Sequence, residues 1–146
     1  MMKWKWLLAS MMLFLSGCSS MMISPEPATM DAGQATMAVT GVSAVDKLIA
    51  KGDSQRRQGE YAQAAATLER ALRLAPGSGA GYLALSRVRL DQQAYREAQQ
   101  LAQKSLSLSG DSRRIQREAW LVIAQARESL GDFQGAQQAR LKANGL

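Results

Sequence analysis

The chain repeats one short stretch three times, as Gly59-Glu60-Tyr61-Ala62-Gln63-Ala64, as Gln93-Ala94-Tyr95-Arg96-Glu97-Ala98 and as Gly131-Asp132-Phe133-Gln134-Gly135-Ala136. Tyr61 and Tyr95 are 34 residues apart, whereas Tyr95 and Phe133 are 38 apart. Residues 43–146 also contain nineteen alanines and a single proline, a composition that favours helices. A helical chain with this period predicts stacked helical hairpins, with four residues inserted before the third copy.

The pattern around these stretches resembles the tetratricopeptide repeat, a helix–turn–helix unit of 34 residues. The resemblance implies an all-α fold, a short α-solenoid of three repeats. The repeats fall at about residues 45–78, 79–112 and 117–146. Small residues are expected where the two helices of a repeat approach closely. These are Gly52, Ser86 and Ala124. The aromatic residues of the quoted stretches are expected to fill the space between repeats.

Local signals predict where the helices begin and end. Ser43 and Asp46 resemble a capping box, so the first helix is expected to begin at Ser43. Gly59 and Gly131 predict the turns between the two helices of the first and third repeats. Pro76 predicts the end of the second helix of the first repeat. The chain departs from the family pattern late in the first helix of each repeat, where a polar residue replaces the usual apolar one. These residues are Gln55, Arg89 and Arg127.

The N-terminus has the pattern of a bacterial lipoprotein signal. Two lysines precede an apolar run from Trp6 to Leu15, which is about half as long as a bilayer-spanning helix. The run leads directly into Leu15-Ser16-Gly17-Cys18, which resembles a lipobox. The resemblance implies a signal peptide over residues 1–17 and acyl chains, palmitate among them, on Cys18. The alternative is a buried free cysteine behind an ordinary signal peptide.

Residues 18–42 are expected to form a flexible tether between this anchor and the repeats in residues 43–146. They contain two prolines, and no helical or alternating pattern runs through them. Ser19 stands where an aspartate favours inner-membrane retention in the enteric family, so the resemblance implies the periplasmic face of the outer membrane. The charges of the signal and the tether cancel, so residues 43–146 carry the whole net charge of +6.

The residue counts exclude most catalytic chemistry. The chain has no histidine, which excludes a Ser-His-Asp triad, a Cys-His pair and a histidine-ligated metal. Its single cysteine excludes an intrachain disulfide and a zinc site built from several thiolates. We therefore expect no enzyme, no cofactor and no metal site. We also expect no nucleic-acid binding, because no recognition motif accompanies the basic charge.

Tetratricopeptide arrays bind extended or helical peptides in a concave groove that the first helix of each repeat lines. Carried over by position, the groove residues of this chain are Ile49, Asp53, Arg56, Leu83, Arg87, Leu90, Leu121 and Gln125. The carboxylate clamp of the chaperone-binding members is absent. Its positions hold Ile49, Asp53, Ala84, Glu118 and Val122. The resemblance implies a protein partner with an apolar or amphipathic segment of some acidic character. Alternatively, half of the groove residues only pack helices together.

Two further surfaces are predicted near the C-terminal repeat. Arg113, Arg114 and Arg117 form a basic patch, which is interpreted either as a solvated helix face or as a contact for a partner or a lipid headgroup. The last helix, from Gly135 to Ala143, is polar enough to cap the array. The alternative is that its alanine face pairs with another protein or forms a homodimer.

Small outer-membrane lipoproteins with tetratricopeptide repeats resemble two functional groups. One group comprises the activators of class A penicillin-binding proteins, of the LpoP type, and the other comprises pilotins for type IV pilus secretins. The pilotins have about six repeats, so the short array favours an adaptor in cell-envelope assembly that activates a peptidoglycan synthase. The remaining alternative is a structural envelope lipoprotein without a dedicated partner.

Overall fold

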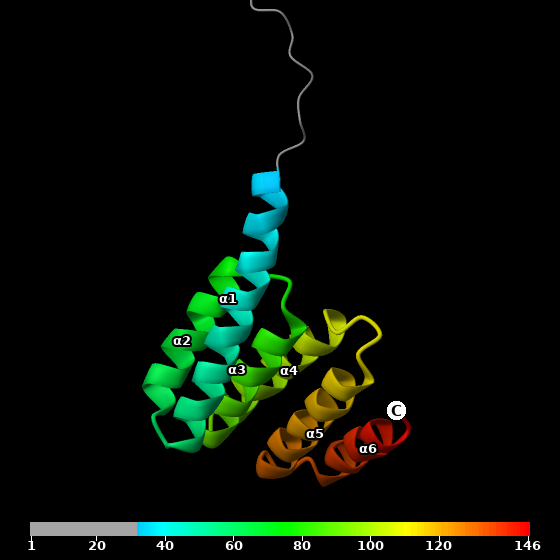
Figure 1. The fold of residues 1–146 in the computed structure, drawn as a ribbon. Coiled ribbons are helices and arrows are strands. Elements are labelled where there is room, and N and C mark those ends of the chain that lie inside the picture. Colours follow the sequence, from blue (N-terminus) through cyan, green and yellow to red (C-terminus); the bar gives the residue numbers. More distant parts are fainter. Residues whose placement is uncertain (1–31) are drawn as a thin grey trace, which may run out of the picture. The chain divides into compact units, whose positions relative to one another are not determined.

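The computed structural model describes residues 32–146, with side chains from Ala44 onward. These residues form six helices and no strand. The helices are α1 (Ala32–Arg57), α2 (Tyr61–Leu74), α3 (Gly79–Asp91), α4 (Tyr95–Ser107), α5 (Arg113–Ser129) and α6 (Phe133–Asn144). Successive helices pair as antiparallel hairpins, and the three hairpins stack side by side (Figure 1). The prediction of a short all-α solenoid of three repeats is confirmed.

The turns within the hairpins share one backbone conformation. Gly59 and Gly131 have φ angles of +79° and +84°, in the left-handed region that glycine adopts without strain. The equivalent residue of the second repeat is Gln93, which has a φ angle of +62°. The predicted stop after the second helix is also found, because α2 ends at Leu74, two residues before Pro76.

Helix α1 begins earlier than the sequence predicted. It starts at Ala32, so the expectation of a helix start and capping box at Ser43 is wrong, and residues 32–42 of the predicted tether are helical. These residues contain no proline, and extending an existing helix costs far less than nucleating one. The predicted signal peptide, Cys18 and the tether up to residue 31 lie outside the described residues. Among residues 32–146, no helix is both long and apolar enough to cross a membrane.

The small residues allow the close helix contact that was expected of them. A Cβ atom on Gly52 would lie 2.5 Å from Cγ of Leu68 in α2, so the buried Leu68 side chain would have to move. Ser86 stands at the same position of the second repeat, where it is fully buried and donates a hydrogen bond to the carbonyl oxygen of Leu83 at 2.7 Å. Ala124 in the third repeat is 1% exposed.

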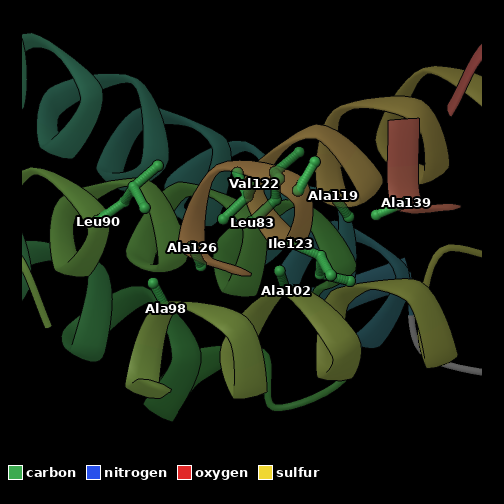
Figure 2. Close-up of a cluster of buried hydrophobic side chains, with 10 residues drawn as sticks. Leu83, Leu90, Ala98, Ala102, Ala119, Val122, Ile123, Ala126 and Ala139 are labelled. Carbon is green, nitrogen blue, oxygen red and sulfur yellow. The ribbon is translucent and has the colours of Figure 1, made fainter. Parts of the chain in front are cut away.

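Two clusters of buried side chains lie in the core of residues 44–146. One is built around Leu68 and Val88 and joins the first repeat to the second. The other is built around Leu83, Val122 and Ile123 and joins the second repeat to the third (Figure 2). Every member of both clusters lies between Ile49 and Ala139.

The C-terminal helix corrects two expectations. Its alanine face is not available for pairing, because Ala136, Ala139 and Ala143 are all 0% exposed within the chain. Phe133 does not fill a space between repeats, because its side chain is 69% exposed. Positions that are apolar in α2 and α4 are polar in α6. Arg140 takes the place of Leu68 and Ala102, and Asn144 takes the place of Leu72 and Leu106. The outer face of α6 is therefore polar.

Candidate partner-binding site

Helices α1, α3 and α5 are the first helices of the three repeats and lie next to one another. Two ion pairs connect them. Nη1 of Arg56 in α1 lies 2.7 Å from Oδ2 of Asp91 in α3. Arg87 in α3 donates in the same way to the carboxylate of Glu118 in α5. Each pair therefore joins the first helix of one repeat to the first helix of the next.

A hollow of about 270 Å³ lies between these two ion pairs. It is lined by Arg56, Arg87, Leu90, Asp91, Glu118, Leu121, Val122 and Gln125. Leu90 and Val122 are almost fully buried and form an apolar floor, whereas Leu121 is 46% exposed. The hollow thus combines an apolar floor with a polar rim, which is the usual composition of a small binding site.

Five of the eight predicted groove residues meet at this hollow, namely Arg56, Arg87, Leu90, Leu121 and Gln125. The other three do not line it. Ile49 is half-buried against the first core cluster, and Asp53 lies beside Arg56, with Oδ1 3.8 Å from Nε. Leu83 is 2% exposed and belongs to the second core cluster, so its prediction as a groove contact is corrected. Its position in the repeat turns it towards α5 rather than into the groove.

The charges of the groove balance one another. Asp91 neutralises Arg56, and Glu118 neutralises Arg87 and also accepts a hydrogen bond from Arg114 at 3.4 Å. The sequence analysis implied a partner of some acidic character and did not include Asp91 among the groove residues. The available signal was the spacing: Asp91 follows Arg56 by 35 residues, about one repeat, and so falls on the neighbouring first helix.

The predicted basic patch lies in the first two turns of α5. The side chain of Ser112 caps this helix and accepts a hydrogen bond from the backbone nitrogen of Ile115 at 3.5 Å. Arg113, Arg114 and Arg117 are all exposed. Arg114 pairs with Glu118, and Nη1 of Arg113 lies 3.4 Å from the carbonyl oxygen of Leu146. The three arginines therefore do not converge on one pocket, but they share one end of the domain.

Three stacked hairpins with a concave hollow on their first helices define a helical-repeat scaffold, a class of protein that presents an extended concave surface for binding. The model of the tetratricopeptide repeat matches residues 55–117. The globular C-terminal domain of P. aeruginosa LpoP is 39% identical in sequence and has a TM-score of 0.67, over 69% of this chain and 95% of that domain. The chain therefore belongs to the tetratricopeptide-repeat family and is an LpoP-like member of it.

Two more distant structures share the fold. The Arabidopsis OM64 TPR domain is 21% identical, with a TM-score of 0.66 over 73% of this chain and 84% of that one. The second TPR of Spaghetti (RPAP3), solved with the HSP90 peptide SRMEEVD, is 19% identical. Its TM-score is 0.65, over 75% of this chain and 97% of that one. At these identities the likeness concerns the fold alone. No curated protein sequence gives a significant match to the chain.

Proposed function

We propose that this protein is a non-catalytic adaptor, anchored through Cys18 to the periplasmic face of the outer membrane, that binds a class A penicillin-binding protein and activates peptidoglycan synthesis. The observation that carries the proposal is the 39% identity to the LpoP domain, which extends over 95% of that domain. The lipobox pattern at Leu15-Ser16-Gly17-Cys18 supports the anchor, and the resemblance to activators of the LpoP type supports the partner.

The hollow on α1, α3 and α5 is the proposed contact surface. Its volume of about 270 Å³ accommodates one or two side chains of a partner segment. Leu121 offers an exposed apolar contact beside the buried floor of Leu90 and Val122. Because both rim arginines are already paired with carboxylates, the site favours an amphipathic segment that contributes an apolar anchor. Attraction of an acidic partner is therefore not the main source of affinity in this proposal.

A binding and activity assay tests the proposal. Residues 19–146 are mixed with a purified class A penicillin-binding protein, and both co-purification and the rate of glycan polymerisation are measured. We expect a complex and a faster rate. Leu121→Asp should weaken binding by at least about tenfold, because it places a charge in an apolar contact. Leu141→Asp is the matched control, since Leu141 is also exposed but lies on α6.

Two results would contradict the proposal in different ways. If the wild-type domain neither binds the synthase nor changes its rate, the proposed partner is wrong. If Leu121→Asp and Leu141→Asp weaken binding equally, the partner is retained but the hollow is not the contact surface. Circular dichroism of both variants verifies that each remains folded, as expected for side chains that are 46% and 65% exposed.

A further inference from the structure

We propose that one end of the helical array binds the phosphate groups of an anionic phospholipid bilayer. Because the hairpins are antiparallel, all three intra-hairpin turns lie at one end, and both inter-repeat loops lie at the other (Figure 1). We call the helix halves nearest the inter-repeat loops the loop end, which comprises residues 44–50, 68–85, 102–121 and 139–146. The remaining residues from 51 to 138 form the turn end.

The positive charge of the domain is concentrated at the loop end. The loop end holds nine basic and four acidic side chains, whereas the turn end holds seven basic and six acidic ones. Two of the four loop-end carboxylates, Glu69 and Glu118, pair with arginines of the turn end, Arg89 and Arg87. Nearly all of the net charge of +6 therefore lies at one end, and most of its cations are available to an external anion.

A basic residue occupies the same repeat position in all three repeats. Arg70, Lys104 and Lys142 follow one another by 34 and 38 residues, on α2, α4 and α6. All three are exposed, and within the described residues none of them forms a salt bridge. Lys142 Nζ lies 4.4 Å from the centroid of the Trp120 ring. The three cations form a row across the second helices, which matches an extended surface better than a single compact anion.

The extra turn of α5 adds further cations to the loop end. The four residues inserted before the third repeat lengthen α5 to 17 residues, against 13 in α3. They carry Arg113 and Arg114 into the loop end, and Arg117 follows one turn later. Cations in the first turn of a helix oppose its dipole, which destabilises the helix slightly. An external anion at this end would offset that cost.

Two observations favour a membrane over an acidic protein. Leu74 is 59% exposed and follows Arg73 in the sequence at the loop end, and an exposed apolar side chain on a basic surface is typical of proteins that lie at a lipid interface. Helix α1 also projects from this end of the domain, so its first residue, Ala32, lies beyond the loop end (Figure 1). The 12 residues of α1 before Ala44 span about 18 Å, and residues 19–31 reach up to about 45 Å when extended. The loop end can therefore reach the surface that holds an anchor at Cys18.

Vesicle co-sedimentation of residues 19–146 tests the proposal without the lipid anchor and without a protein partner. The vesicles contain phosphatidylethanolamine and phosphatidylglycerol, and vesicles of phosphatidylcholine serve as the neutral reference. The loop-end variant carries Arg70→Gln, Lys104→Gln and Arg117→Gln. The matched turn-end variant carries Lys51→Gln, Arg57→Gln and Arg96→Gln, so both lose three exposed cations that form no salt bridge.

We expect the wild-type domain to bind only the phosphatidylglycerol vesicles, and to be released at high salt. The loop-end variant should bind about a hundredfold more weakly at low salt. Each cation near an anionic surface raises the affinity for the membrane by a factor of about five, and this variant lacks three of them. The turn-end variant should lose less than about tenfold. Equal losses in the two variants would show that only net charge matters and would overturn the proposal.

A fluorescent probe supplies a second measurement. Residues 19–146 contain no cysteine, so Leu74→Cys and Leu130→Cys each take a single polarity-sensitive label, at the loop end and the turn end respectively. On anionic vesicles, the emission maximum of the label at position 74 should shift to shorter wavelength, whereas that of the label at position 130 should not change. The membrane proposal is wrong if the wild-type domain does not sediment with anionic vesicles. If, in addition, a protein co-purifies with the wild-type domain but not with the loop-end variant, this end binds an acidic protein instead.

Discussion

Leu83 and Leu121 show how a single position separates the core of this domain from its surface. Both lie on first helices, and both were predicted to line the groove from the same family pattern. Leu83 is 2% exposed and packs with Val122 and Ile123, whereas Leu121 is 46% exposed at the hollow. The two leucines therefore differ in what a charge would do to them, because an unpaired charge is tolerated only where water reaches it.

Leu83→Asp is expected to unfold or severely destabilise the domain. Burying an unpaired carboxylate costs about 3–5 kcal/mol, which is a large part of the stability of a small domain. Chemical denaturation followed by circular dichroism should show a strongly lowered midpoint or no folded baseline. Leu121→Asp is the control, and its free energy of unfolding should stay within about 1 kcal/mol of the wild-type value. A folded Leu83→Asp variant of wild-type stability would place this side chain in the groove after all.

Cys18 is the other residue on which a specific expectation rests, and it lies outside the described part of the chain. The lipobox interpretation predicts that Cys18→Ala removes the acylated thiol and leaves the signal peptide uncleaved. Radioactive palmitate should label the wild-type protein but not the variant, and the variant should migrate as the longer precursor. Ser20→Ala serves as the control and should be labelled normally. Palmitate labelling of the Cys18→Ala variant would contradict the lipoprotein prediction.

At the scale of the helices, the polar residues that replace an apolar one in each repeat hold the hairpin together by hydrogen bonds. Gln55 accepts a hydrogen bond from Thr67 in α2 at 2.8 Å. Arg127 donates to the carbonyl oxygen of Gly135 in α6 at 3.2 Å. Arg89 extends furthest, because its Nε lies 2.8 Å from Glu97 in α4 and its Nη2 lies 3.1 Å from Glu69 in α2. Polar contact thus takes over the role of packing at this position.

Arg89→Ala should cost about 1–2 kcal/mol of unfolding free energy, because this side chain is 19% exposed and joins α3 to two other helices. Arg140→Ala is the matched control. Its pair with Glu128 joins only α5 and α6 and is 47% exposed, so its loss should cost less than about 0.5 kcal/mol. Urea unfolding at low and high salt measures both values. Equal costs for the two variants would show that Arg89 acts only as a surface ion pair.

The helices themselves were largely predictable from the sequence, because the 34-residue period and the positions of Gly59, Pro76 and Gly131 are local signals. The start of α1 was not, since no residue between Ala32 and Ser43 forces a helix to begin or to end. The hollow was predicted in part. Its arginines follow from the family pattern, but their neutralisation by Asp91 and Glu118 depends on how neighbouring repeats are stacked. That stacking is a property of tertiary structure.

At the scale of the whole molecule, each repeat depends on the next one for burial. The second cluster takes Leu83 and Leu90 from α3, Ala98 and Ala102 from α4, and its remaining members from α5 and α6. In a solenoid, stability is approximately a sum of terms for single repeats and for the interfaces between neighbours. Three repeats are the usual minimum at which these interface terms outweigh the conformational entropy of the chain.

Removal of α5 and α6 should therefore abolish cooperative folding. A chain of residues 19–110 would expose Leu83, Leu90, Ala98 and Ala102 to water, and the lost burial would amount to several kcal/mol. Thermal unfolding followed by circular dichroism should show a broad or absent transition. A chain of residues 44–146 is the control, since it removes a comparable part of the sequence but keeps both core clusters, and its transition should stay cooperative. A sharp, wild-type-like transition in residues 19–110 would show that two repeats suffice and that the interface with α5 contributes little.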